Sequence, residues 1–175
     1  LYLHVGASLK RLILGWTLGT IFGITLGFLI GLFSTVRAGL APIVAAIFPV
    51  PKIALLPLFI IWFGIGELSK VNLILFGTLF PTIIATYGAI DNVDRSLIRM
   101  GQSFNLSWFS ITKKIILPAS LPAILSSMRI TAAIAIILIV AAELIAAEKG
   151  IGAYIQMAGS LFAIDRLLAG VIILS

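Results

Sequence analysis

Long uncharged runs dominate this sequence and are separated by short intervals that carry charge. Three runs stand out, at residues 12–36, 71–90 and 123–142, and only the last of them holds a charged residue, Arg129. A helix rises about 1.5 Å per residue, so about 20 apolar residues cross the roughly 30 Å hydrocarbon core of a bilayer. The pattern therefore predicts three long membrane-spanning helices, with Pro81 as a kink in the helix at residues 71–90.

A more broken apolar region lies between the first two runs. Residues 38–66 contain a single charged residue, Lys52, together with prolines at positions 42, 49, 51 and 57. Because proline interrupts helical hydrogen bonding, this region predicts a short amphipathic or loop piece, followed by a short span that begins near Ile53.

Composition places the chain in a membrane and removes several classes of function. Hydrophobic residues make up 61% of the sequence and charged residues 10%, and the mean hydropathy is +1.24. These values exclude an ordinary soluble domain and a disordered chain. With Cys 0, disulfide scaffolds and thiolate metal sites are excluded as well. The net charge of +6 is spread among apolar runs, so we interpret it as a topology signal and expect no nucleic-acid partner.

Glycine recurs at every fourth position of the first run. A period of four residues places these glycines on one slowly turning stripe of a helix, where another backbone can approach closely. We therefore expect the first span to pack tightly inside a bundle through Gly15, Gly19, Gly23, Gly27 and Gly31.

The distribution of basic residues predicts the orientation of the spans. If residues 91–122 face the cytoplasm, that side carries seven Lys and Arg residues, namely Arg37, Lys52, Arg95, Arg99, Lys113, Lys114 and Arg129. The other side carries five, namely Lys10, Arg11, Lys70, Lys149 and Arg166. The excess favours a cytoplasmic loop and an external Leu1.

The two ends of the sequence suggest a longer protein. Leu1 is not an initiator methionine, and the apolar stretch from Leu167 to Ser175 is too short to span a bilayer. We expect these 175 residues to be one transmembrane domain from a longer chain, with the last span truncated and an upstream span missing.

Residues 91–122 form the one long polar interval. Asp91 is the expected N-cap of a short amphipathic helix, whose apolar residues recur at helical spacing at Val93, Leu97, Met100 and Phe104. Asn105 follows where a left-handed residue would end the helix, and a second helix is expected from Leu106 to Ile116, ended by Pro118. Spacing alone leaves two interpretations open, a solvated connector and a working loop.

This interval resembles the signature loop of the membrane subunits of binding-protein-dependent ABC importers. The family pattern runs Glu-Ala-Ala, three residues, Gly, nine residues, Ile, one residue, Leu-Pro. Asn105 stands in the Gly place, nine residues follow, and then come Ile115, Ile116, Leu117 and Pro118. The first half departs from the pattern, because Arg99, Met100 and Gly101 occupy the Glu-Ala-Ala positions.

Further stretches are similar to the nitrate, sulfonate, taurine and bicarbonate permease subgroup of this family. They are PVPKIALLPLFIIWFGIG (49–66), GTLFPTIIAT (77–86), LPASLPAILSSMR (117–129) and VAAELIAAEKGIGAYI (140–155). The resemblance implies an all-α polytopic membrane bundle of the type I (MetI-like) importer permease kind, with about five core spans. It also implies a prokaryotic inner or plasma membrane location, no enzymatic activity and no cofactor.

The resemblance further implies partners. These are cytoplasmic ABC ATPase subunits, an extracytoplasmic solute-binding protein and a second permease copy in a homodimer, all within membrane lipid. The loop at residues 91–122 would be the coupling helix that docks on the ATPase. Its residues would be Leu97, Met100, Gly101, Phe104, Asn105, Leu106, Ile115, Leu117 and Pro118. Arg99 reverses the charge of the family's glutamate, so a salt bridge there would need a different partner or be absent.

Other polar residues are candidates for a translocation pathway, namely Thr82, Ser126, Thr131 and Glu143. At the end of a span, Glu143 and Glu148 are more often solvated or capping groups. His4 lies outside the predicted spans and, without cysteine, forms no metal constellation. A secondary transporter would need ionisable groups at mid-membrane, and an intramembrane enzyme would need a catalytic constellation; the sequence favours neither.

Overall fold

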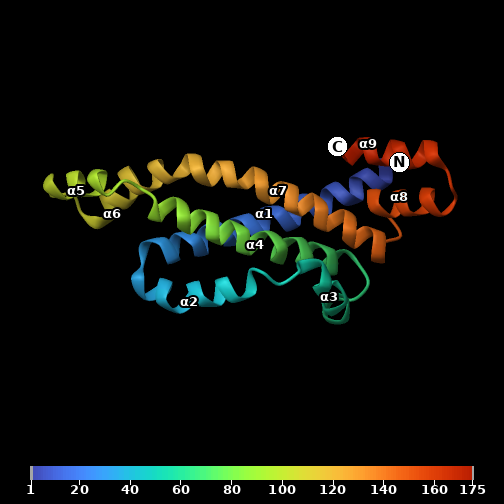
Figure 1. The fold of residues 1–175 in the computed structure, drawn as a ribbon, viewed down its shortest axis with the longest axis horizontal. Helices are drawn as coiled ribbons and strands as arrows, with labels where there is room; N and C mark the ends of the chain where they lie inside the picture. Colours follow the sequence, from blue (N-terminus) through green and yellow to red (C-terminus); the bar gives the residue numbers. More distant parts are fainter. Residues whose placement is uncertain (1, 175) are drawn as a thin grey trace. The chain divides into compact units, whose positions relative to one another are not determined.

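The computed structural model describes residues 2–174, and every regular element among them is helical. The longer helices are α1 (Tyr2–Leu32), α2 (Ser34–Ile47), α3 (Leu56–Phe63), α4 (Glu67–Asp91), α5 (Arg95–Ser103), α7 (Leu117–Ala146), α8 (Ile151–Ser160) and α9 (Ile164–Leu174). A 3-10 turn, η1 (Lys52–Leu55), precedes α3, and α6 (Trp108–Ile111) leads into a π-helical turn, η2 (Thr112–Ile116). The predicted all-α class is confirmed (Figure 1).

The chain forms two compact units, and long helices contribute a part to each. Unit 1 contains residues 2–19, 51–78 and 132–174 of the described chain. Its core holds two apolar clusters, one of Leu56, Phe59, Leu73 and Ala142 and one of Ile74, Ala135, Leu138 and Ile139. In the same unit, α8 and α9 lie side by side (Figure 1). These contacts bring the first half of α4 against η1, α3 and the second half of α7.

Unit 2 contains residues 20–50 and 79–131. Its apolar cluster is built from Ile90, Val93, Ile111 and Ile116, with further packing from Phe28, Leu32, Ile98, Leu106 and Ile115. The end of α4 and the short helices α5 and α6 are thus fixed to one another by buried side chains. Residues 91–122 are therefore an ordered loop.

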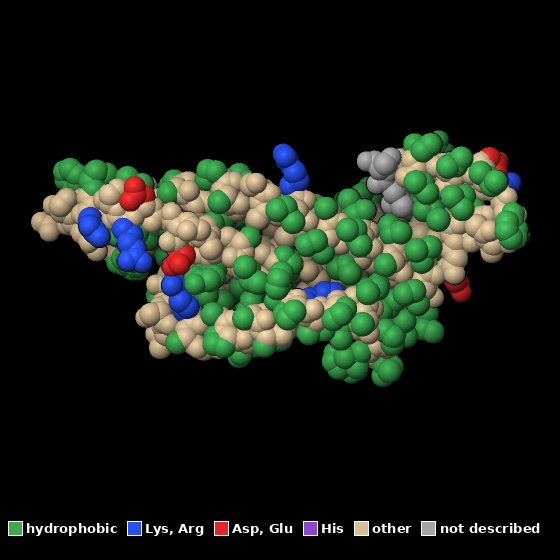
Figure 2. Space-filling model, viewed as in Figure 1, with side chains coloured by type: hydrophobic (Ala, Val, Ile, Leu, Met, Phe, Trp, Pro, Cys, Tyr) green, Lys and Arg blue, Asp and Glu red, His purple; other side chains and the backbone are tan. Residues whose placement is uncertain are grey.

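Three helical segments of the described residues are long and apolar enough to cross a membrane. They are Tyr2–Leu32, Glu67–Asp91 and Trp108–Ala146, and the interrupted pair Ser34–Ile47 and Lys52–Phe63 would make a fourth. The predicted number was about five, and the break between α2 and η1 falls where the sequence places Pro49 and Pro51. On the face that Figure 2 shows, hydrophobic side chains far outnumber charged ones, as a lipid-facing surface requires.

Two expected helix ends are wrong. Asp91 ends α4, and the N-cap of α5 is Asp94, whose carboxylate accepts a hydrogen bond from Ser96 N–H at 2.8 Å. Pro118 does not end a helix; it lies in the first turn of α7, directly after the π turn η2, and such a local π turn is one of the adjustments by which a membrane helix accommodates proline. The π turn η2 joins α6 to α7, so no break occurs at the position that proline suggested.

Candidate functional site

The loop in unit 2 presents an apolar helix face to solvent. Leu97 and Met100 of α5 are 39% and 50% exposed, and Phe104, its C-cap residue, is 73% exposed. Ile98 of the same helix packs against the cluster. The cap at Asp94 fixes the start of this helix, and the N–H donated by Ser96 lowers the pKa of the Asp94 carboxyl. The loop therefore carries exposed apolar groups on an ordered frame.

A tight turn follows α5 and depends on two residues from the motif. Asn105 adopts the left-handed conformation expected for it, with φ 53°. Asn105 N–H donates to Gln102 O at 2.9 Å, and Leu106 N–H donates to Gly101 O at 3.1 Å. A Cβ at Gly101 would lie 2.7 Å from Ile115 Cδ1, so this glycine permits close packing of α5 against η2.

Of the remaining motif residues, two pack against the apolar cluster of unit 2 and two are exposed. Leu106 and Ile115 pack against the apolar cluster of unit 2, whereas Leu117 is 40% exposed and Pro118 is exposed. The side chain of Arg99 is exposed and takes part in none of the three ion pairs found in the described chain. The docking role of these residues stays a prediction.

The glycine stripe of α1 lies against α4 in both units. In unit 1, a Cβ at Gly15 would lie 2.7 Å from Ile74 Cβ, and one at Gly19 would lie 2.7 Å from Leu75 O. In unit 2, a Cβ at each of the remaining stripe glycines would lie 2.6–2.8 Å from a side-chain atom of α4, for Gly23, Gly27 and Gly31. These distances are too short for any side chain, so only glycine permits this packing.

The four pathway candidates do not share one environment. In unit 2, Thr82 is fully buried, Thr131 is buried with its hydroxyl donating to Met128 O at 3.1 Å, and Ser126 is exposed. Glu143 belongs to unit 1. Their role in translocation remains a prediction.

Unit 1 holds a buried cluster of charged side chains that the sequence did not predict. Glu143 is fully buried, which contradicts the expectation of a solvated group. Arg11 Nη1 donates to Glu143 Oε1 at 2.7 Å, and Arg11 Nε donates to Glu67 Oε2 at 2.7 Å. A third bond runs from Arg11 Nη1 to Lys149 O at 2.7 Å. The guanidinium of Arg11 thus joins α1 to α4 and to the end of α7. Hydrogen bonds between charged groups are stronger than those between neutral groups.

The same carboxylate also organises the start of α8. Gly152 N–H donates to Glu143 Oε2 at 3.0 Å, and Ser8 Oγ donates to the carboxylate at 2.7 Å while accepting from Ile151 N–H at 2.8 Å. His4 lies within α1, where its Nδ1 accepts from Gly150 N–H at 3.1 Å. The capping alternative for Glu143 is therefore confirmed, but with a buried carboxylate.

The sequence did contain a signal for this cluster. In the sequence Arg11 serves as a topology marker, yet an ionisable residue at the edge of a membrane span often pairs with another charged group. The pairing of Arg11 with Glu143 joins positions 132 residues apart, so no local spacing rule could have identified it. Among the described residues, no group of three or more His, Cys, Asp or Glu side chains is arranged to hold a metal ion.

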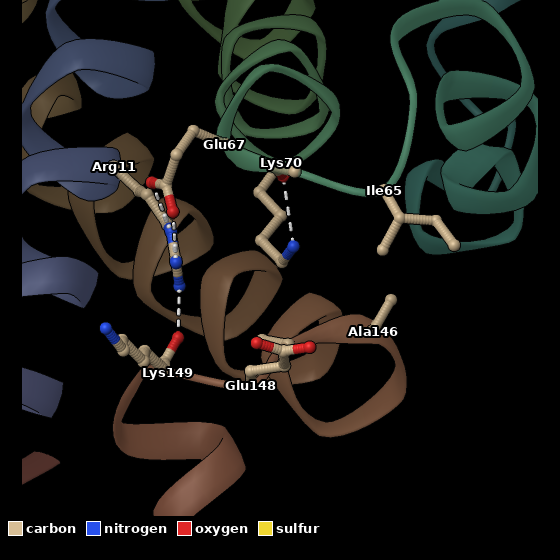
Figure 3. A pocket seen from close by; sticks show the side chains of 9 residues that line it. Arg11, Ile65, Glu67, Lys70, Ala146, Glu148 and Lys149 are labelled. Carbon is tan, nitrogen blue, oxygen red and sulfur yellow. Dashed lines mark hydrogen bonds and ion pairs between the residues drawn. The ribbon is translucent and has the colours of Figure 1, made fainter.

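A cavity of about 480 Å³ opens beside this cluster within unit 1. Its wall is formed by Arg11, Ile65, Gly66, Glu67, Lys70, Ala146, Ala147, Glu148 and Lys149. Figure 3 shows that the side chains of Lys70 and Glu148 reach this cavity from different segments, with Ile65 and Ala146 beside them. Polar and apolar groups therefore meet in one small chamber.

Comparison with known proteins gives consistent matches. A sequence model described as "Binding-protein-dependent transport system inner membrane component" matches residues 19–175. The taurine transport system permease protein TauC of Escherichia coli (strain K12) is 41% identical over 175 residues, which is 100% of this chain and 64% of the relative. The putative aliphatic sulfonates transport permease protein SsuC of Bacillus subtilis (strain 168) is 36% identical, covering 99% of this chain and 63% of the relative.

The chain thus spans less than two thirds of the length of these two relatives. A chain in the crystal structures of inward-facing conformations of the MetNI methionine ABC transporter superposes with a TM-score of 0.77. The match covers 98% of this chain and 88% of that one at 19% identity, which shows a shared fold.

Proposed function

We propose, since the chain belongs to the family of binding-protein-dependent transport system inner membrane components, that it is the permease subunit of an ATP-driven importer. In this role it supplies membrane helices around a solute pathway and has no enzymatic activity of its own. ATP hydrolysis belongs to separate cytoplasmic subunits. The three long apolar segments and the fold shared with a methionine ABC transporter support this assignment.

The observation that carries the proposal is the ordered loop with an exposed apolar face between two membrane-length helices. Residues 91–122 join α4 to α7, and their exposed side chains at Leu97, Met100 and Phe104 line α5 and its C-cap. A helix that binds in a groove needs apolar anchors at this spacing. We assign residues 91–122 to a cytoplasmic coupling loop that docks on the ATPase, within a single transmembrane domain.

The shape of the loop fits the transmission of movement. The cluster of Ile90, Val93, Ile111 and Ile116 fixes α5 and α6 to the end of α4. When α5 moves, the end of α4 would therefore move with it as a rigid body, because the loop between them cannot bend freely.

The proposed solute is a small polar anion or zwitterion of the sulfonate, taurine, nitrate or bicarbonate kind. The named relatives support the sulfonate and taurine members of this group. The complete importer would also contain a second copy of the permease and an external binding protein that delivers the solute. Both are inferred from the family, and its description as an inner membrane component supports the proposed location.

The decisive experiment is transport by the reconstituted importer. The full-length permease, its ATPase and its binding protein are placed in liposomes, and uptake of radiolabelled taurine is measured with and without ATP. Uptake that requires ATP and is abolished by a hydrolysis-deficient ATPase supports the proposal. Uptake driven by an ion gradient without ATP would instead identify a secondary transporter.

A further inference from the structure

We propose that the cavity in unit 1 binds a small zwitterionic solute, with Lys70 holding its acidic group and Glu148 its ammonium group. This inference rests on the proposed function and adds a binding site to it.

Arg11 has little left to offer a solute, because four of its five N–H donors are already used. Its Nε and Nη2 bond to the carboxylate of Glu67, and its Nη1 bonds to Glu143 and to Lys149 O. Two carboxylates therefore surround one guanidinium and more than balance its charge. The cation left to recognise an acidic group in this cavity must be another residue.

Lys70 is that cation. It lies in the first turn of α4, is only 3% exposed, and lines the cavity. Its Nζ donates to Gly66 O at 3.0 Å, and no carboxylate of the described chain lies within ion-pair distance of it. An ammonium has three donors, and a buried charge is costly unless it is paired. The acidic group of a solute in the cavity would complete this pairing.

The charge around the cavity distinguishes a zwitterion from a simple anion. Three cations, Arg11, Lys70 and Lys149, are matched by three carboxylates at Glu67, Glu148 and the adjoining Glu143. The sum is zero, so the cavity as a whole does not concentrate anions. Separated opposite charges instead favour a ligand that carries both signs.

Glu148 supplies the second half of this arrangement. It follows the end of α7, is exposed, and enters into none of the ion pairs of the described chain. Figure 3 shows its carboxylate and the Lys70 ammonium reaching one chamber from two segments. Ile65 and Ala146 line the same chamber and offer an apolar surface to a short carbon chain between the two charged groups.

The position along α4 agrees with a site for the arriving solute. Lys70 lies near the start of α4 and Asp91 ends it, and α4 is long and apolar enough to cross a membrane. With the proposed cytoplasmic placement of the 91–122 loop, Lys70 is on the external side. A binding protein would release its solute on that side.

The test measures direct binding to the whole permease–ATPase complex in nanodiscs, without the binding protein. Three probes of similar size separate the charges: taurine carries both, isethionate replaces the ammonium by a hydroxyl, and ethanolamine lacks the sulfonate. Lys70→Met and Glu148→Gln remove one charge each, and Lys10→Met removes an exposed lysine of α1 that is not part of the cavity wall.

We expect taurine affinity to fall at least tenfold in Lys70→Met and in Glu148→Gln, and to stay unchanged in Lys10→Met. Glu148→Gln should leave the weaker isethionate binding unaffected, whereas Lys70→Met should abolish it. Because Glu148 is exposed, its variant tests the site even if the Lys70 variant folds poorly. Wild-type affinity for taurine in Glu148→Gln, or no saturable taurine binding by the wild type, overturns the inference.

A parallel uptake assay separates this inference from the proposed function. If the wild-type importer takes up taurine with ATP while both cavity variants bind it normally, only the site assignment fails. If the wild-type importer shows no ATP-dependent uptake of any solute, the function itself fails.

Discussion

Arg11 Nη1 and Glu143 Oε1 lie 2.7 Å apart, although 132 positions separate the two residues in the chain. The Glu143 side chain is fully buried and that of Arg11 is 4% exposed. Because Glu143 also accepts from Ser8 Oγ and Gly152 N–H, one carboxylate connects α1 and α7 to the start of α8. The buried pair therefore holds three helices of unit 1 together.

Replacement of Glu143 by Gln should destabilise the protein by about 3 kcal/mol, because it removes one partner of a buried ion pair. Glu67→Gln is the matched control. Glu67 bonds to the same guanidinium, but its side chain is 56% exposed, so the cost should stay below about 1 kcal/mol. Thermal unfolding of both variants in detergent measures the difference in stability. Equal losses of stability in the two variants would mean that the burial of Glu143 does not strengthen its ion pair.

Replacement of Gly27 by Ala should destabilise the packing of α1 on α4 within unit 2. A Cβ at this position would lie 2.6 Å from Thr86 Cβ and 2.9 Å from Ile83 O, and backbone atoms cannot move aside easily. Overpacking of this kind costs about 1–3 kcal/mol.

Gly39→Ala provides the opposite control for this prediction. Gly39 lies inside α2, and no atom beyond its own stretch of helix lies within 4 Å of the position that an alanine methyl group would take, so alanine should stabilise the helix by up to about 1 kcal/mol. Urea or thermal unfolding of the two variants should show shifts of opposite sign. A neutral Gly27→Ala variant would refute close contact between α1 and α4 at this point.

The sequence predicts features that depend on local pattern. Apolar runs predict α1, α4 and α7, and the period of four predicts which face of α1 is glycine-rich, because both follow from the geometry of a single helix. Asn105 is likewise predictable, since few residues other than glycine adopt a left-handed conformation at low cost.

Features that depend on long-range packing escape such prediction. Glu143 resembles a solvated end-of-helix residue until α1 brings Arg11 and Ser8 beside it. Pro118 resembles a helix terminator, and its actual place in the first turn of α7 depends on how η2 continues the chain. Lys70 counts as a topology marker in the sequence, and only its burial beside a cavity suggests a binding role.

Replacement of Phe104 by Glu should uncouple the permease from its ATPase. Phe104 is 73% exposed, so a charge there should leave the loop folded and remove one apolar anchor of the proposed docking face. Gln102→Glu places the same charge on an exposed polar residue of α5 and should have a smaller effect. Co-purification of the ATPase and solute-stimulated ATP hydrolysis report the result. ATPase binding and uptake at wild-type levels in Phe104→Glu would contradict the docking assignment.

Leu106→Glu should behave differently from Phe104→Glu, although both residues belong to the signature loop. Leu106 packs against the apolar cluster of unit 2, so a carboxylate there disrupts the loop itself. We expect Leu106→Glu to increase proteolytic cleavage within residues 91–122, and Phe104→Glu to leave cleavage unchanged. Equal protection from proteolysis in the two variants would show that Leu106 does not hold the loop in its folded conformation.

Asp94 should make the stability of α5 depend on pH. The Ser96 N–H bond to the carboxylate lowers the pKa of Asp94 in the folded protein below its ordinary value. The folded state therefore gains from the ionised carboxylate, and this gain is present above the ordinary aspartate pKa and is lost as the pH falls through the lowered folded pKa. Amide hydrogen exchange in α5 should accelerate over that acidic range. Asp94→Asn keeps an N-cap oxygen without a titrating group, so its exchange should lack this step, whereas Asp94→Ala should exchange faster at every pH. An acid step of the same size in Asp94→Asn would assign the titration to another group.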